Sequence, residues 1–197
     1  MPTMTEQTLI ANLQAHDPAA YAVLIESYSN LVYRVVYNIL QTPQDAEDAL
    51  QETFITIYNQ IGNFRGESKL SSWIYRVATN TALNCIQRKK RKMGQDVPMI
   101  SDDDDEETEL EIGDALTPLP ETMLESQETA VLLHEALQEL SPKLRSALVL
   151  FELEGLSMKE TAVALDISES AAKLRVRRAR IELQRILARH MQETTVS

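Results

Sequence analysis

The sequence predicts an all-helical protein in which two small helical domains are joined by an acidic linker. Hydrophobic residues make up 44% of the 197 positions, and only five residues are glycine. Apolar side chains recur three and four positions apart rather than at alternate positions, which is typical of amphipathic helices and not of strands. No run of about 18 apolar residues occurs, so we expect no membrane-spanning helix.

The termini and the cysteine content bear on location. Residues 1–11 lack a basic start followed by an apolar core, so no signal peptide is expected there. The single cysteine, Cys85, excludes an internal disulfide and a multi-cysteine metal site. These observations favour a reducing, cytoplasmic location.

The first predicted domain covers residues 1–92 and contains four helices. The first helix covers residues 5–15. The second begins near Pro18 and carries an apolar stripe formed by Tyr21, Leu24, Ile25, Tyr28, Val32, Val35, Val36 and Ile39. The third begins at residues 42–45, where Thr42 is expected to cap it and Pro43 suits its first turn. Residues 62–68 form a loop, and a fourth helix, at about 70–90, ends in basic residues.

Residues 93–125 are predicted to be a flexible linker. They hold 12 of the 30 acidic residues and no Lys or Arg, so 18 acidic residues remain against all 19 basic ones elsewhere. The formal net charge of -11 therefore comes from the linker, and the rest of the chain has a net charge of +1. Such a segment buries too little apolar surface to fold alone.

The second predicted domain covers residues 126–197, with helices expected at about 128–139, 142–152, 157–165 and 168–188. Ser157 and Ser168 are expected to cap the last two, with a tight turn at Asp166 and Ile167 between them. A short helix, a tight turn and a second helix that starts with small residues are typical of a helix-turn-helix, whose second helix fits the major groove of DNA.

The second helix of this motif is strongly basic. Its cations can neutralise phosphates, and Arg can read guanine with two hydrogen bonds. They are Lys173, Arg175, Arg177, Arg178 and Arg180. A solvated basic face is the alternative, but five cations within eight residues favour DNA binding.

The third helix of the first domain carries an acidic face. Asp45, Asp48 and Glu52 share this face by their spacing, and Glu47 and Gln51 flank it. Acids near a helix start favour the helix dipole, which explains Asp45 and Glu47 without any partner. A docking surface for a basic partner would explain all five residues. Both interpretations stay open from the residues alone.

The fourth helix carries side chains suited to single-stranded nucleic acid. Asn80 and Asn84 lie one turn apart, with Tyr75 and Arg76 on the same side. Amides that bind bases, aromatic rings that stack on them and cations for phosphates are the usual means of single-strand recognition. Trp73 lies on the apolar stripe, so we favour a place in the core for it.

These stretches together resemble a known family. Residues 45–54 and 64–80 resemble region two of the extracytoplasmic-function (ECF) sigma factors, and residues 140–157 and 175–180 resemble their region four. The motifs follow the family's order and spacing. The chain departs from the family at residues 170–172, where Ser-Ala-Ala replaces the frequent Gly-Thr-Val, and at residue 174, where Leu replaces Ser. These departures leave the upstream sequence preference open.

The resemblance implies a non-catalytic subunit, without cofactor or metal, that directs RNA polymerase to promoter DNA. Five residues would dock on the clamp helices of the β′ subunit: Asp45, Glu47, Asp48, Gln51 and Glu52. Eight would open and read the minus-ten element: Phe64, Arg65, Ser68, Tyr75, Arg76, Asn80, Asn84 and Arg88. Five would read the minus-thirty-five element: Ser170, Lys173, Arg175, Arg177 and Arg178. The β flap would be a further contact in core polymerase, and an anti-sigma factor would be a possible further partner.

Two other classes of function compete with this interpretation. A free-standing helix-turn-helix regulator would need only the second domain and would leave the acidic face and Asn80 unexplained. An enzyme fits less well, because the sequence shows no His/Asp/Ser set, no metal-binding cluster and no phosphate-binding loop.

Overall fold

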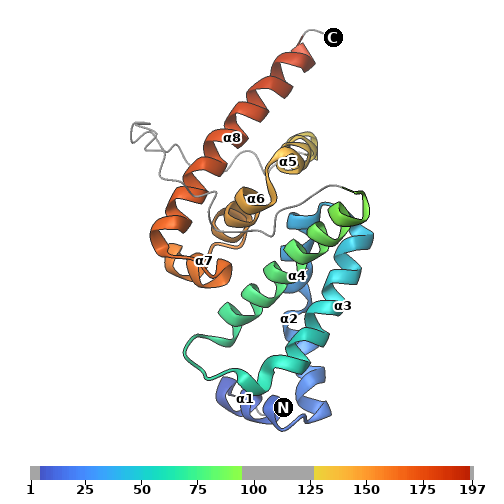
Figure 1. Cartoon of the computed structure of the whole chain (residues 1–197), viewed down its shortest axis with the longest axis vertical. Coiled ribbons are helices and arrows are strands. Elements are labelled where there is room, and N and C mark those ends of the chain that lie inside the picture. The colour runs from blue at the N-terminus through green and yellow to red at the C-terminus, as the bar shows by residue number, and fades with distance from the viewer. Residues whose placement is uncertain (1–4, 95–126, 196–197) are drawn as a thin grey trace.

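The computed structural model describes residues 5–94 and 127–195, which form helices and contain no strand (Figure 1). The predicted all-helical fold is confirmed. Most of the predicted flexible linker, residues 95–125, lies outside the described residues. Among the helices within those ranges, none combines the length and the apolar character needed to cross a membrane.

The first domain is built on three long helices that pack against one another. A short helix, α1, packs beside the start of α2 and beside the helical turn η1. The elements are α1 (Glu6–Gln14), α2 (Pro18–Leu40), α3 (Pro43–Gln60), η1 (Ile61–Asn63) and α4 (Leu70–Lys92).

The start of α3 differs in one detail from the prediction. Pro43 occupies the first turn as expected, but Thr42 does not cap the helix. Its hydroxyl instead donates to the carbonyl of Leu40 at 3.1 Å, because Gln41 in the left-handed conformation (φ 63°) closes the turn between α2 and α3. The prediction of a Thr42 cap was wrong, although the helix boundary was right.

The apolar stripe of α2 faces the core with one exception. Its fully buried members include Leu24, Val32, Val36 and Ile39. Ile25, predicted on the same stripe, is 46% exposed and was wrongly placed there.

The second domain has a core of its own between α5, α6 and α8. Its elements are α5 (Gln127–Glu139), α6 (Pro142–Leu148), η4 (Val149–Leu153), α7 (Met158–Leu165) and α8 (Glu169–Thr195). The helix expected at 142–152 is divided, since α6 ends at Leu148 and η4 continues as one π-helical turn. The last helix is longer than expected, and its C-terminal half projects from the body (Figure 1).

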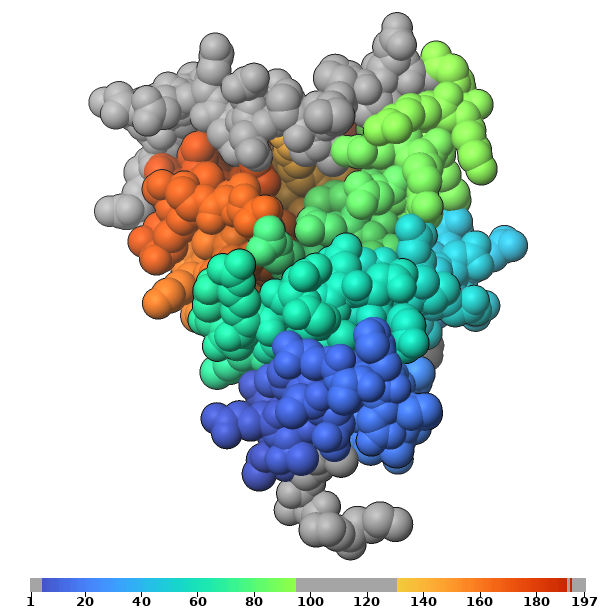
Figure 2. Space-filling model, turned by 60° about the horizontal axis from the view of Figure 1, so that its bottom comes forward, coloured from blue at the N-terminus to red at the C-terminus, as the bar shows by residue number. Residues whose placement is uncertain are grey.

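The two domains lie against each other. α7 packs on α4, and Leu150, Leu156 and Leu165 of the second domain belong to the same buried cluster as the core of the first. Figure 2 shows α7 and the start of α8, in orange, beside the green and teal segments of α4 and its preceding loop. This packing was not predicted from the sequence.

Candidate polymerase and nucleic-acid interfaces

The acidic face of α3 is partly open to solvent. Glu47, Asp48 and Gln51 are exposed, whereas Asp45 and Glu52 are partly covered. Gln51 follows Asp48 by three positions and Glu47 by four, so the three exposed side chains lie on one side of α3, where an approaching partner meets them first.

The two covered acids are paired with the basic end of α4. Lys89 donates to Asp45, and Arg88 donates to Glu52 at 2.5 Å. The hydrogen bond from Lys89 lowers the pKa of Asp45, and the one to Glu52 raises the pKa of Arg88. The like charges of the acidic face are therefore offset within the domain, and one predicted minus-ten residue, Arg88, lies beside a predicted docking residue.

The loop before α4 is held in place by α1. Gln14 donates from its amide to the carbonyls of Phe64 (2.9 Å) and Ile61 (3.3 Å), and Glu6 accepts from the backbone N–H of Leu70 at the start of α4 (3.3 Å). Phe64 is buried with its ring centroid 5.3 Å from that of Trp73. These contacts fix where the loop meets α4, while Arg65 stays exposed.

A groove of about 490 Å³ lies between α3 and α4. Asn80 and Asn84 line it, are exposed and stand one helical turn apart. Trp73 and Arg76 line the same groove, with Glu52 from α3 on the other wall. The groove thus brings together amides, an aromatic ring and a cation, the groups that bind an unpaired base and its phosphate.

The helix-turn-helix has the expected local structure. Ser157 and Glu160 form a reciprocal cap at the start of α7, with N–H to oxygen distances of 3.3 and 3.0 Å. The hydrogen bonds from Ser157 lower the pKa of Glu160. Asp166 ends α7 in the left-handed conformation (φ 59°), and Ser168 accepts from the N–H of Ala171 at 3.1 Å. The predicted Ser157 and Ser168 caps are confirmed.

The residues of α8 that were predicted to bind DNA differ in exposure. Ser170 and Lys173 are exposed, Arg177 and Arg178 are half-buried, and Arg175 is only 5% exposed. Arg180 turns into its own domain, where it pairs with Glu152 of η4 and lies over the ring of Phe151, 5.4 Å from its centroid. In this arrangement, therefore, Arg175 is not presented to DNA and Arg180 serves packing.

Comparison with known proteins decides the family. Models of Sigma-70 region 2 and Sigma-70 region 4 match residues 24–92 and 130–183. The RNA polymerase sigma-H factor of Pseudomonas aeruginosa is 33% identical over 185 residues, covering 92% of this chain and 93% of that protein. The ECF RNA polymerase sigma-E factor of Escherichia coli is 34% identical over 180 residues, covering 90% and 91%. This chain belongs to the ECF sigma factor family. As a sigma factor it binds core RNA polymerase and directs promoter recognition and transcription initiation.

Solved structures agree with this fold. CnrH, solved in complex with the cytosolic domain of CnrY, superposes with a TM-score of 0.64 at 18% identity, covering 93% of this chain and 97% of that chain. The sigma factor RpoE of Bartonella quintana, in complex with the anti-sigma factor NepR, gives a TM-score of 0.61 at 21% identity, covering 85% and 96%. Relatives match across both domains, which disfavours a free-standing helix-turn-helix regulator.

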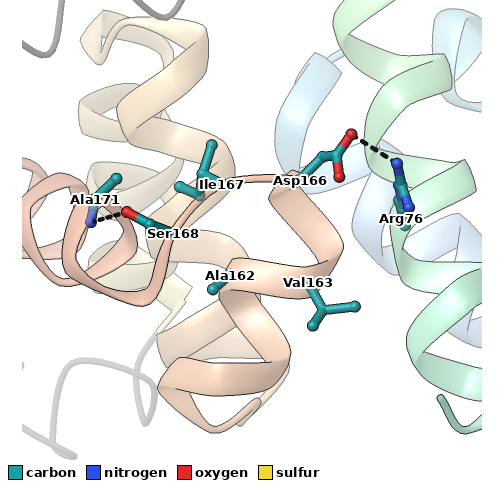
Figure 3. A pocket seen from close by; sticks show the side chains of 7 residues that line it. All are labelled: Arg76, Ala162, Val163, Asp166, Ile167, Ser168 and Ala171. Atoms are coloured by element: carbon teal, nitrogen blue, oxygen red, sulfur yellow. Dashed lines mark hydrogen bonds and ion pairs between the residues drawn. The ribbon is translucent and has the colours of Figure 1, made fainter. Parts of the chain in front are cut away.

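Some predicted site residues of the sigma factor meet at the contact between its domains. Arg76 of α4 pairs with Asp166 in the turn of the helix-turn-helix at 2.6 Å (Figure 3). The two residues line a groove of about 720 Å³ with Ile167, Ser168 and Ala171. Tyr75 donates from its hydroxyl to Glu154 of the second domain at 3.2 Å and so points away from the groove that holds Asn80.

Sequence reasoning missed two exposed apolar residues on α3. Ile55 is 61% exposed and Tyr58 is 47% exposed. They continue the face of Asp48 and Gln51 at helical spacing, and the Tyr58 ring contacts that of Tyr21 with centroids 4.8 Å apart. The spacing of positions 48, 51, 55 and 58 could have revealed this extension.

It also missed the residues that join the domains. Arg34 is the only basic residue in the 23 residues of α2, and it pairs with Glu154. Arg145 is buried and donates to the carbonyl of Ile39 in the first domain at 2.7 Å. A lone cation within a mostly apolar helix was the available signal for Arg34.

Proposed function

We propose that this sigma factor uses three separate surfaces for its three contacts. The exposed face of α3 docks on the clamp helices of the β′ subunit, the groove between α3 and α4 holds an unpaired base of the minus-ten element, and the start of α8 reads the minus-thirty-five element. The protein itself catalyses no reaction and acts in the cytoplasm, where polymerase and promoter are found. The β flap is the proposed contact of the second domain.

The observation that carries this assignment is the groove between α3 and α4. Asn80 and Asn84 reach it from exposed positions, and Trp73 forms part of its wall. A side-chain amide can pair with a base edge, and base–aromatic stacking contributes about 1–3 kcal/mol per base. Mid-helix Asn has little helical merit of its own, which agrees with a binding role for both amides.

The assignment of the docking surface is supported by the order of acidic and apolar residues along the exposed face of α3. Its acidic half, with Glu47, Asp48 and Gln51, continues into the apolar half with Ile55 and Tyr58. Apolar contact supplies affinity, and charge supplies orientation and rapid encounter. Beside this surface, Glu52 pairs with Arg88 and Asp45 pairs with Lys89. These ion pairs join α3 to the end of α4.

The test of minus-ten recognition is promoter opening by holoenzyme. Asn80→Ala should reduce permanganate reactivity of the opened strand roughly tenfold or more while leaving the closed complex intact, because the lost contact is to an unpaired base. Asn30→Ala, at an exposed position of α2, is the matched control. Equal opening by Asn80→Ala and wild type would remove the groove from the proposal.

The test of docking is affinity for core polymerase. Asp48→Lys should weaken binding by at least about tenfold, since it reverses a charge in the centre of the proposed contact. Glu26→Lys makes the same change at an exposed position of α2 and should bind as wild type does. If both variants bind core equally well, docking lies elsewhere.

An anti-sigma factor is a further proposed partner. The support is that a chain of the same fold, RpoE of Bartonella quintana, was solved with the anti-sigma factor NepR. Co-purification of an unrelated small protein with this chain, lost on adding core polymerase, would identify such a partner.

A further inference from the structure

The contact between the two domains has a continuous apolar part. Leu156 precedes α7 and Leu165 ends it, and both side chains are less than 10% exposed. They belong to one buried cluster with Ile74 and Val77 of α4 and Ile39 of α2. Apolar surface removed from water in this way stabilises the arrangement in which the two domains pack together, called the closed arrangement below.

A buried carboxylate lies beside this apolar contact. The side chain of Glu154 is only 1% exposed, although it sits next to the exposed Gly155 between η4 and α7. Both of its oxygens bind Arg34, with Oε1 3.2 Å from Nε and Oε2 2.7 Å from Nη2. The Tyr75 hydroxyl donates to Oε2 at 3.2 Å. Among the described residues, the hydrogen-bond partners of the Glu154 carboxylate all come from the first domain.

The Glu154 carboxylate shifts the pKa values of both of its partners. The hydrogen bond to Glu154 raises the pKa of Arg34, and burial next to the Glu154 charge raises the pKa of Tyr75 to about 12. A buried carboxylate is costly unless it is paired, so removing one partner destabilises the arrangement that buries it. When the domains separate, Glu154 regains water, and the cost disappears.

Two further polar contacts cross the same boundary. Arg76 pairs with Asp166 at 2.6 Å in the helix-turn-helix (Figure 3), and Lys69 lies 3.7 Å from Glu160 at the other end of α7. Together with Glu154 they fix both ends of α7 against the first domain. The helix-turn-helix is thereby held at the side of α4.

The closed arrangement is incompatible with simultaneous reading of two promoter elements. Their names place them roughly 25 base pairs apart, which is roughly 85 Å along B-form DNA at about 3.4 Å per base pair. Here the Arg76 guanidinium, on the proposed minus-ten surface, is 2.6 Å from the turn that precedes the proposed minus-thirty-five helix. The domains must therefore separate before both elements can be bound.

We propose that Glu154, held by Arg34 and Tyr75, is a latch that keeps the free sigma factor closed and restrains its helix-turn-helix from DNA. The proposal rests on the assignment of promoter-reading surfaces above. Because Arg34 is 58% exposed, water and salt can reach one side of the latch, so it opens without unfolding either domain.

The test measures closure and DNA binding in the same full-length protein. Cys85 is replaced by Ser, and cysteines at the exposed positions Asn30 and Lys159 carry a fluorescent donor and acceptor, one in each domain. Glu154→Gln should lower energy transfer in free protein and raise affinity for a duplex with the upstream element by at least about tenfold. Arg34→Gln should act in the same direction from the other domain.

Two controls isolate the latch. Glu182→Gln removes the same charge from an exposed ion pair within α8 and should change neither readout. The charge exchange Arg34→Glu with Glu154→Arg should restore most of the energy transfer, which a general loss of packing would not allow. Far-ultraviolet circular dichroism verifies that each variant is folded.

Two results would overturn the latch. Unchanged energy transfer in both Glu154→Gln and Arg34→Gln would show that these residues do not hold the domains together. Lower energy transfer with unchanged duplex affinity would show that closure does not restrain DNA binding. Neither readout requires polymerase, so core-dependent run-off transcription by the wild type separately tests the proposed function.

Discussion

Arg145 shows how one side chain can serve two domains. It is 8% exposed and donates to three backbone carbonyls, those of Gln138, Leu140 and Ile39, at 2.7–2.9 Å. Burial lowers its pKa, but a guanidinium stays protonated in proteins. The side chain closes the turn between α5 and α6 and at the same time reaches the end of α2.

We expect Arg145→Met to lower the free energy of unfolding by about 2–4 kcal/mol, because three buried or partly buried carbonyls lose a charged donor. Arg145→Lys should recover only part of this loss, since an ammonium cannot reproduce the planar geometry of the guanidinium. Urea unfolding of both variants checks the expectation. A loss within error of zero for Arg145→Met would contradict the role of these hydrogen bonds.

Asp45 should make the first domain sensitive to acid. Its folded-state pKa lies below the ordinary 3.8 because Lys89 donates to it. A lowered pKa contributes stability above pH 3.8, and this contribution disappears as the pH falls through the lowered value. Asp45→Asn should therefore be less stable than wild type by up to about 1 kcal/mol at pH 6, with the difference vanishing toward pH 2.

The control for Asp45 is its partner. In a Lys89→Met background, Asp45→Asn should lose most of that pH-dependent difference, as measured by urea unfolding at each pH. A difference that stays constant from pH 6 to pH 2 would mean that the ion pair makes no net contribution.

For single residues, a contact could be predicted from the sequence when its partner lies close along the chain, and could not when the partner is distant. The Ser157 cap followed from the sequence because both partner groups belong to Glu160, only three residues away. The pairing of Asp45 with Lys89 spans 44 positions and depends on how α3 and α4 pack. The burial of Arg175 likewise could not be predicted, because its position on a basic helix does not reveal which other elements cover its side chain.

Among the elements, α7 depends most on its cap. It has only eight residues, and short helices are marginal without added contacts. Ser157→Ala should lower the free energy of unfolding by about 1 kcal/mol, because the N–H of Glu160 loses its acceptor. Thermal unfolding measures this loss of stability. Ser157→Thr is the control, because it keeps the hydroxyl. Equal stability of the Ala and Thr variants would contradict a capping role.

The π-helical turn at Val149–Leu153 was the main surprise among the elements. All its residues but Glu152 are apolar and the spacing is helical, so the pattern predicts a continuous helix from 142 to 152. In the structure the wider turn directs Glu152 toward Arg180 and precedes Glu154, which faces the first domain. Apolar periodicity alone does not reveal where a helix widens in this way.

For the whole molecule, the helix starts were predicted closely, whereas the division of the helix expected at 142–152, the length of the last helix and the closed packing of the domains were not. Periodicity shows which face of a helix is apolar, but it does not show what that face packs against. The same types of apolar residue form the core of each domain and the contact between the domains. Leu156 and Leu165 could equally have faced α8 alone. Only the fold shows that they also join the core of the first domain.

A domain-level prediction follows for DNA binding. The fragment of residues 126–197 should bind a duplex with the upstream element more tightly than full-length protein does without core polymerase. Two causes act together: the first domain packs on α7, and the 12 acids of residues 93–125 compete for the basic helix. The gap should shrink with rising salt, which screens charges over roughly 10 Å at 0.1 M.

Fluorescence anisotropy across ionic strength measures that gap. A longer fragment, residues 93–197, keeps the acids but lacks the first domain, so it separates the two causes. If all three proteins bind the duplex equally at low salt, neither the acids nor the domain contact restrains α8.

The contact through Glu154 also has a consequence for the set of promoters as a whole. A protein whose binding-competent form is a fraction of the total binds every target more weakly by that same fraction. Each 1.4 kcal/mol favouring the closed form lowers the open fraction about tenfold. Because this factor belongs to the protein and not to the DNA, the latch would scale occupancy of all unsaturated promoters together. Their ranking would still be set by base sequence alone.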